Sequence, residues 1–177
     1  MPNIVLHGRE FEPFLPASEI SQAIQKVADQ INHDYKDREP VFIGVLNGAF
    51  MFASDLFKLL HVPCYISFVK LSSYVGTQST GQVKQLMGLT ESLKGRHVIV
   101  LEDIIDTGKT VVELKALLKE LQPGSVAIAT MFDKPSCRQH EIKADYHGIS
   151  LPDEFVVGYG LDFDGLGRNY PDLYRTV

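Results

Sequence analysis

Residues 97–110 have the sequence His97-Val-Ile-Val-Leu-Glu-Asp-Ile-Ile-Asp-Thr-Gly-Lys-Thr110, which contains the clearest structural signal in the chain. The apolar run that leads to Glu102 is typical of a strand buried on both faces. After a short turn, the apolar spacing of residues 110–121 predicts a helix that ends before Pro123-Gly124. A strand that passes through a turn into a helix is the repeating unit of α/β proteins.

The segments on both sides of this unit continue the alternation. Apolar periodicity predicts further helices and strands, the helices over 18–35 and 49–60 and the strands over 41–46, 64–71, 125–132 and 155–159. We therefore expect an α/β fold with a mostly parallel central sheet flanked by helices. Ligands of such sheets bind outside the carboxyl ends of the strands. No repeat or linker divides the chain, so residues 1–177 are expected to form one domain.

The composition limits the classes of partner. The net charge is −5, which argues against a protein that binds nucleic acid through its phosphates. No apolar run approaches the roughly 18 residues needed to cross a membrane, and the first residues do not resemble a secretory signal. The two cysteines, Cys64 and Cys137, are far apart and are expected to be reduced thiols. A cytoplasmic protein is the natural expectation.

The turn after Glu102 combines acidic residues with a phosphate-binding pattern. Thr107-Gly-Lys-Thr110 opens the predicted helix, and a helix N-terminus offers free N–H groups and a positive dipole end to a phosphate. Gly108 allows the backbone to approach closely, and the threonine hydroxyls add donors. The P-loop of nucleotide triphosphatases is an alternative interpretation, but it requires a glycine where Asp103 stands. A carboxylate there would repel the phosphates, so the P-loop is excluded.

Three carboxylates precede this phosphate-binding turn. Glu102 and Asp103 can accept hydrogen bonds from the hydroxyls of a ribose or hold Mg²⁺ together with water and phosphate oxygens. Successive strand residues point to opposite faces, so only one of the two is expected to face the ligand unless the strand has already ended. Asp106 lies in the turn and is free to accept a proton. Together these groups predict a ligand that has a 5′-phosphate, a ribose diol and a bound metal.

Residues 100–110 resemble the phosphoribosyl pyrophosphate motif of the type I phosphoribosyltransferases. Over residues 41–168 the chain is similar more specifically to the hypoxanthine(-guanine) phosphoribosyltransferases. The resemblance implies the type I fold with a small hood formed by the chain ends. It also implies that the chain converts hypoxanthine, and guanine as well, with phosphoribosyl pyrophosphate to IMP or GMP and pyrophosphate. Mg²⁺ as cofactor and a homodimer or homotetramer are further implications. The first 40 residues match no family signature, and we assign them only a structural role.

The resemblance assigns roles to the residues around phosphoribosyl pyrophosphate. Glu102 and Asp103 correspond to the acids at the ribose hydroxyls and Mg²⁺, and Asp106 to the proton acceptor beside purine N7. The 5′-phosphate loop comprises Asp106, Thr107, Gly108, Lys109 and Thr110.

Pyrophosphate is expected to bind at Asn47, Gly48 and Arg168, with a cis peptide before Asn47 that exposes backbone N–H groups. The family often has a basic residue at position 47, so the backbone and not the asparagine side chain is expected to bind. Asp162 corresponds to a second magnesium ligand within the base-binding region.

The remaining assignments concern a lid and the purine. Ser73 and Tyr74 match a lid in residues 72–85 that closes during the reaction, and the polar composition of this segment suits that role. In the base-binding region, residues 133–177, Lys134 matches the donor to the 6-oxo group of the purine. Phe155 matches the aromatic residue that stacks on the base, and Val156 provides backbone contacts.

Three alternatives stay open at this point. The first is a xanthine-preferring phosphoribosyltransferase, because the contacts at the purine 2-position are expected to come from the backbone. The second is an enzyme for adenine or a pyrimidine, although Lys134 favours a 6-oxo group over adenine. The third is a regulatory protein that binds phosphoribosyl pyrophosphate without catalysis, against which the lid and base-site residues argue.

Overall fold

The computed structural model describes residues 1–71 and 92–177. Its main sheet has five parallel strands in the order β4-β3-β5-β6-β7. The strands are β3 (Val41–Leu46), β4 (Tyr65–Lys70), β5 (His97–Ile105), β6 (Ser125–Asp133) and β7 (Tyr146–Ser150). The predicted parallel sheet is therefore confirmed, with β5 at its centre. Only β7 was not predicted among these strands.

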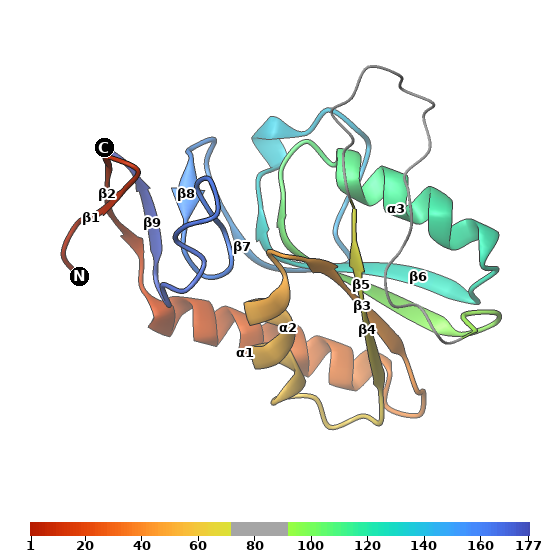
Figure 1. Cartoon of the computed structure of the whole chain (residues 1–177). Coiled ribbons are helices and arrows are strands. Elements are labelled where there is room, and N and C mark those ends of the chain that lie inside the picture. The colour runs from red at the N-terminus through yellow and green to blue at the C-terminus, as the bar shows by residue number, and fades with distance from the viewer. Residues whose placement is uncertain (72–91) are drawn as a thin grey trace, which may run out of the picture.

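Helices cover both faces of this sheet (Figure 1). Helices α1 (Ala17–Asp34) and α2 (Phe50–Phe57) lie on one face, and α3 (Lys109–Glu120) lies on the other. All three were predicted, although α2 ends three residues before the predicted limit. Among the described residues, no helix is long and apolar enough to cross a membrane.

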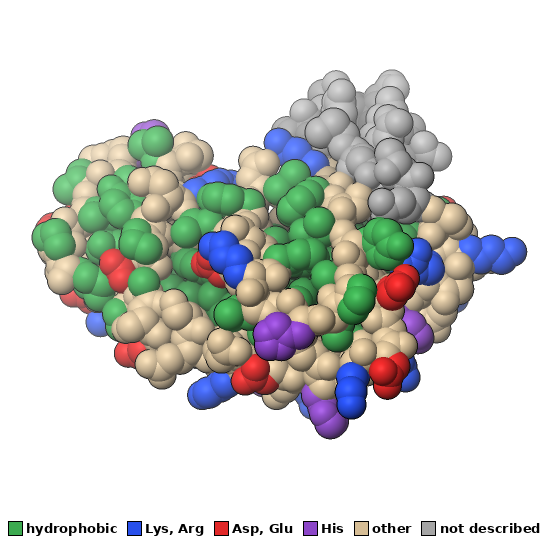
Figure 2. Space-filling model, turned by 90° about the horizontal axis from the view of Figure 1, so that it is seen from below, with side chains coloured by type: hydrophobic (Ala, Val, Ile, Leu, Met, Phe, Trp, Pro, Cys, Tyr) green, Lys and Arg blue, Asp and Glu red, His purple; other side chains and the backbone are tan. Residues whose placement is uncertain are grey.

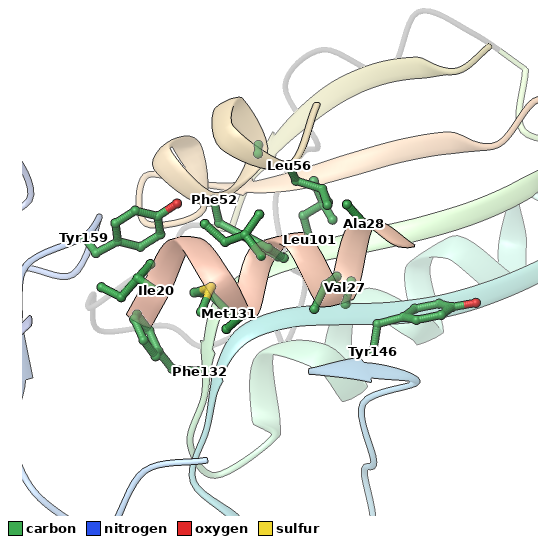
Figure 3. Packing of buried hydrophobic residues seen from close by; sticks show 14 of the residues in the cluster. Ile20, Val27, Ala28, Phe52, Leu56, Leu101, Met131, Phe132, Tyr146 and Tyr159 are labelled. Carbon is green, nitrogen blue, oxygen red and sulfur yellow. The ribbon is translucent and has the colours of Figure 1, made fainter. Parts of the chain in front are cut away.

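The alternation of β5 divides the core into two layers. Ile99 and Leu101 pack in the cluster under α1 and α2, whereas Val98 and Val100 pack in the cluster under α3. In the first cluster the apolar stripe of α1 meets side chains from α2 and from the sheet, as Figure 3 shows for Val27, Phe52, Leu56, Leu101 and Met131. The strand is thus buried on both faces, as its continuous apolar sequence indicates.

The chain ends form a second, antiparallel sheet, the hood, in the order β1-β2-β9-β8. Its strands are β1 (Ile4–Leu6), β2 (Arg9–Leu15), β8 (Val156–Val157) and β9 (Leu173–Thr176). Both termini lie at this end of the molecule (Figure 1), and Figure 2 shows hydrophobic side chains over the hood and across the middle of the face that is seen from below. The hood agrees with the expected role of the chain ends.

The predicted strand 155–159 is wrong in length and in partner. Only Val156 and Val157 are strand residues, and they pair with β9 in the hood instead of extending the parallel sheet. Gly158 and Tyr159 have φ angles of +103° and +45°, so the chain turns away directly after β8. A side chain at position 158 would lie 2.1 Å from the Asp172 carbonyl oxygen, so only glycine fits this turn.

Candidate active site

The carboxyl ends of β3 and β5 and the segment 158–168 enclose a cavity of about 360 Å³. This is the edge of the sheet at which ligands of α/β proteins bind. Nine of the predicted site residues line it: Gly48, Glu102, Asp103, Asp106, Thr107, Gly108, Thr110, Asp162 and Arg168. The residues predicted for pyrophosphate, ribose and 5′-phosphate thus come together from three separate parts of the chain.

The predicted phosphate loop leads from β5 into α3. Gly108 immediately precedes the helix with a φ of +85°, a conformation that glycine adopts without strain. The Lys109 N–H donates to Thr107 Oγ1 at 3.3 Å. The Lys109 side chain is exposed and lies 3.9 Å from Glu113, a weak surface pair. Asp106 is exposed in the turn, where a ligand can reach it.

Glu102 and Asp103 both line the cavity, although β5 continues to Ile105. The alternation of side chains along a strand led us to expect only one of them here, and both acids reach the cavity. The last pair between β3 and β5 is Gly44 with Leu101, so from Glu102 onward β5 is no longer paired with β3.

The carboxyl groups of Glu102 and Asp103 both have pKa values above the ordinary range. Glu102 is only 3% exposed, and burial, reinforced by the Asp103 charge, raises the pKa of its carboxyl well above the ordinary value. Burial also raises the pKa of Asp103 to about 6, although the Ile104 N–H, 2.8 Å from Asp103 Oδ1, favours the ionised form. In the described residues Glu102 Oε1 is buried without a hydrogen-bond partner. Such an atom requires a hydroxyl, a water molecule or a cation at this point of the cavity.

Oxygen ligands for Mg²⁺ are present here. The unpartnered oxygen of Glu102 and the carboxylate of Asp103 are hard oxygen donors, which this ion prefers. No group of three or more His, Cys, Asp or Glu side chains converges in the described ranges, 1–71 and 92–177. That arrangement fits Mg²⁺, which is usually held by one or two carboxylates together with water and substrate phosphates.

The loop after β3 lies against the acids. The Leu46–Asn47 peptide is cis, as predicted, and Asn47 is exposed and does not line the cavity. A Cβ at Gly48 would lie 1.5 Å from Asp103 Oδ2, and a Cβ at Gly160 would lie 2.2 Å from the Gly48 carbonyl oxygen. Glycine at both positions allows the loop, β5 and the segment 158–168 to approach one another.

Asp162 and Arg168 form an ion pair at the edge of the cavity. Arg168 Nη2 lies 2.6 Å from Asp162 Oδ1, and its Nη1 donates to the Gly160 carbonyl at 2.6 Å. Asp162 Oδ2 also accepts the Gly165 N–H at 2.7 Å. Asp162 is thus engaged with Arg168 and its own loop.

Of the predicted base-binding residues, Asp162 lines the cavity, whereas Lys134, Phe155 and Val156 do not. Lys134 is only 6% exposed, and its Nζ donates to the Glu154 carbonyl at 2.6 Å. Its backbone N–H donates to the Ile105 carbonyl at 3.0 Å, which places it beside Asp106. Phe155 is 44% exposed and Val156 is buried. An exposed aromatic ring beside a buried lysine is suited to stack on a flat heterocycle and bind its oxygen.

Two of the predicted site residues are not described by the structure, and one residue at the site was not predicted. Ser73 and Tyr74 lie outside the described residues. Arg138, which the sequence did not single out, donates to the Asp106 carbonyl and pairs with Asp133. Nothing in the local sequence distinguishes this arginine, because its partners are brought to it only by the fold.

Known proteins are similar to this chain in both fold and sequence. Residues 14–164 match the phosphoribosyl transferase domain family. The hypoxanthine-guanine phosphoribosyltransferase of Streptococcus pneumoniae is 43% identical over 154 residues, 86% of either chain. The hypoxanthine phosphoribosyltransferase of Salmonella typhimurium is 40% identical over 169 residues, which are 94% of this chain and 95% of that protein.

The crystal structure of a hypoxanthine-guanine phosphoribosyltransferase from Bacillus anthracis has a TM-score of 0.85 at 35% identity. The match covers 94% of this chain and 98% of that one. Together with the cavity, these likenesses show that the chain belongs to the phosphoribosyl transferase family. Within that family, its relatives named above are hypoxanthine and hypoxanthine-guanine phosphoribosyltransferases.

Proposed function

We infer that this chain is a hypoxanthine phosphoribosyltransferase of purine salvage. It joins hypoxanthine to the ribose of phosphoribosyl pyrophosphate and produces IMP and pyrophosphate. The observation that carries the inference is the arrangement at the end of β5 and β6. There a phosphate loop and two carboxylates line one cavity, and the backbone of a buried lysine is bonded to Ile105 of that lining. An exposed phenylalanine follows the residue whose carbonyl binds this lysine.

The reaction forms the bond between purine N9 and the anomeric carbon of ribose and breaks the bond from that carbon to pyrophosphate. We propose that residues 106–110 bind the 5′-phosphate and that Glu102 and Asp103 hold the ribose hydroxyls. Backbone N–H groups of Asn47 and Gly48, with Arg168, bind the departing pyrophosphate. These contacts supply positioning and charge stabilisation as charge grows on ribose and pyrophosphate.

The purine is held by the residues beside the cavity. In this proposal Lys134 donates to the 6-oxo group, Phe155 stacks on the ring and Val156 contributes backbone contacts. Asp106 accepts or holds the proton of the base. Guanine carries the same 6-oxo group, so we propose it as a second substrate. Xanthine also carries this group, and a preference for it is the alternative that the assay below decides.

Mg²⁺ is part of the proposal because Glu102 Oε1 needs a partner. Glu102 and Asp103 would hold the ion, with Asp162 as a further ligand if it separates from Arg168. When bound, Mg²⁺ neutralises charge on the pyrophosphate group. We also propose a homodimer or homotetramer, supported by the exposed apolar side chains of Phe50, Tyr65 and Ile66 on α2 and the edge strand β4. Light scattering on the purified protein measures this state.

The test is an assay of nucleotide formation from phosphoribosyl pyrophosphate and Mg²⁺ with hypoxanthine, guanine, xanthine and adenine supplied separately. We expect IMP and GMP, no AMP, and loss of both products when Mg²⁺ is chelated. Asp106→Asn should lower kcat by about a hundredfold or more while the KM for phosphoribosyl pyrophosphate changes little. Tight binding of phosphoribosyl pyrophosphate with no product from any base would instead indicate the regulatory protein.

A further inference from the structure

The segment after β6, residues 134–142, lies against the outer side of the phosphate loop. The N–H groups of Gln139 and His140 both point at the Thr107 carbonyl oxygen, at 3.0 and 3.3 Å. Arg138 Nη1 donates to the Asp106 carbonyl oxygen at 2.7 Å. Two consecutive carbonyl groups of the phosphate loop are therefore held by this one segment.

Arg138 also binds the end of β6. Its Nη2 forms an ion pair with the carboxylate of Asp133, the residue that immediately precedes Lys134. Only 14% of the Arg138 side chain and 17% of the Asp133 side chain are exposed, so water screens the pair weakly. A guanidinium presents several donors in one rigid plane and can bind a carbonyl and a carboxylate at once. Lysine lacks that planar geometry.

Holding these carbonyls determines where the next N–H groups point. The peptides 106–107 and 107–108 are trans, and in a trans peptide the C=O and the following N–H point in opposite directions. Because the carbonyls of Asp106 and Thr107 face residues 138–140, the N–H groups of Thr107 and Gly108 are directed to the other side, toward the cavity that both residues line. Neither N–H donates to an acceptor within 1–71 or 92–177. Two adjacent free donors are suited to a phosphate.

We propose that Arg138 is a positioning residue for the transfer reaction, which holds the peptides of the phosphate loop in the orientation that binds the 5′-phosphate. This rests on the proposed function. Through Asp133, the same guanidinium connects the phosphate loop to the strand that carries Lys134. The guanidinium binds the backbone of the phosphate loop directly, at the Asp106 carbonyl, whereas Lys134 Nζ is held separately by the Glu154 carbonyl. The loss of Arg138 should therefore affect the phosphoribosyl substrate far more than the purine.

The experiment compares Arg138→Ala, Arg138→Lys and the unchanged protein. We expect Arg138→Ala to raise the KM for phosphoribosyl pyrophosphate about tenfold or more, since a hydrogen bond from a charged donor is lost. The KM for hypoxanthine should stay within about twofold. Arg138→Lys should be intermediate, and added guanidinium ion should partly restore Arg138→Ala. The affinity for ribose 5-phosphate, measured by calorimetry, should fall by the same factor as the KM rises.

Arg96→Ala is the matched control. Arg96 also donates to a backbone carbonyl, that of Glu39 at 3.1 Å, and its guanidinium lies 4.6 Å from the Tyr65 ring centroid, but it stands before β5, at the amino end of the sheet. We expect this variant to keep both KM values. Arg138 variants that melt at a lower temperature yet bind ribose 5-phosphate unchanged would overturn the proposal in favour of a purely structural role. If Arg138→Ala does not fold, Arg138→Lys carries the same test.

The calorimetric measurement separates this inference from the proposed function. If the unchanged protein forms no nucleotide from any purine, the proposed function fails. Ribose 5-phosphate affinity still reports on the phosphate loop in that case, and a tenfold weaker affinity in Arg138→Ala would support the positioning role. If the unchanged protein is active and Arg138→Ala retains both its KM and its affinity, only the inference about Arg138 fails.

Discussion

Asp103 lies so close to the loop after β3 that position 48 accepts only glycine. A Cβ there would stand 1.5 Å from Asp103 Oδ2 and 2.3 Å from its Cγ. Both distances are far below van der Waals contact, so a larger residue must displace either the loop or the acid. Asp103 is fixed on β5, whose strand pairing with β6 continues beyond it to Ile105. The loop is therefore the part expected to move.

Gly48→Ala should inactivate the enzyme while the fold persists. A shift of about 1 Å in a site that works by positioning can cost about a hundredfold in rate, so we expect at least that loss in kcat/KM. Nucleotide formation and circular dichroism measure the two properties. Gly95→Ala is the control, because its φ of +71° strains an alanine although nothing lies within 4 Å of the new Cβ. That variant should lose stability and keep its activity; equal activity in both variants would contradict the prediction.

The raised pKa of Asp103 makes the stability of the protein depend on pH in a defined direction. Burial raises this pKa to about 6, whereas an aspartate in an unfolded chain titrates near 3.9. Between these values the folded protein holds a proton that the unfolded chain has released. The protonated Asp103 carboxyl therefore contributes to the stability of the folded protein at low pH. This contribution is lost as the pH rises through about 6.

Asp103→Asn should remove this loss. Without Mg²⁺, the variant should be as stable as the unchanged protein near about pH 4 and more stable by on the order of 1–3 kcal/mol above about pH 7. Urea unfolding across this pH range in the presence of a chelator measures the difference. Asp37→Asn, which removes an exposed carboxylate from the loop after α1, should show no such trend. If the difference in stability between Asp103→Asn and the unchanged protein did not vary with pH, the raised pKa of Asp103 would be contradicted.

At the scale of the elements, one arginine joins the hood to the base site. Arg175 on β9 binds Glu12 of β2 at 2.8 Å and Glu154 at 3.2 Å. The carbonyl of Glu154 accepts the hydrogen bond from Lys134, and Phe155 follows it directly. The side chains of both ion pairs are more than a third exposed, so water screens them and each contributes little to stability.

Arg175→Ala should therefore weaken purine binding only modestly. We expect the KM for hypoxanthine to rise about two- to fivefold, because the two ion pairs are screened, and the KM for phosphoribosyl pyrophosphate to stay unchanged. Steady-state kinetics with each substrate varied in turn measure both constants. Arg38→Ala, which removes an arginine stacked on Tyr35 near the end of α1, is the control and should change neither. A rise in both constants would mean that the hood also supports the phosphate loop.

For the molecule as a whole, the hood and the main sheet share one core. The hydrophobic cluster around α1 contains Leu101 and Met131 from the main sheet together with Val156 and Leu173 from the hood. The N-terminus of α1 is also tied to the hood segment, because the Ala17 N–H donates to Asp172 Oδ1 at 2.7 Å. Neither sheet can lose its packing without exposing apolar surface of the other.

We accordingly expect the whole chain to unfold as one domain. Differential scanning calorimetry should give a single transition whose calorimetric enthalpy per folded unit equals the van't Hoff enthalpy. Measurements at several protein concentrations separate the unfolding of the chain from the dissociation of subunits. Two transitions that persist at every concentration would show that the hood unfolds independently and would contradict the shared core.

The main sheet could be predicted from the sequence because its signals are local. Residues 98–101 and 41–46 are continuous apolar runs, and such runs indicate buried parallel strands without knowledge of their partners. The hood could not be predicted in the same way. Strand β2 contains Pro13 and charged residues, and it is stabilised by pairing with β9, about 160 residues further along the chain. Pairing over that separation leaves no local pattern.

The motif at residues 102–110 indicated its chemistry from residue types and spacing alone, since carboxylates and a glycine at a helix N-terminus act through short-range geometry. Only the tertiary structure decided which distant groups surround it. The approach of Gly48 to Asp103, the Glu154 carbonyl on Lys134 and the guanidinium of Arg138 on Asp106 all join segments that the chain order separates. Such contacts depend on how a parallel sheet gathers the carboxyl ends of its strands at one edge.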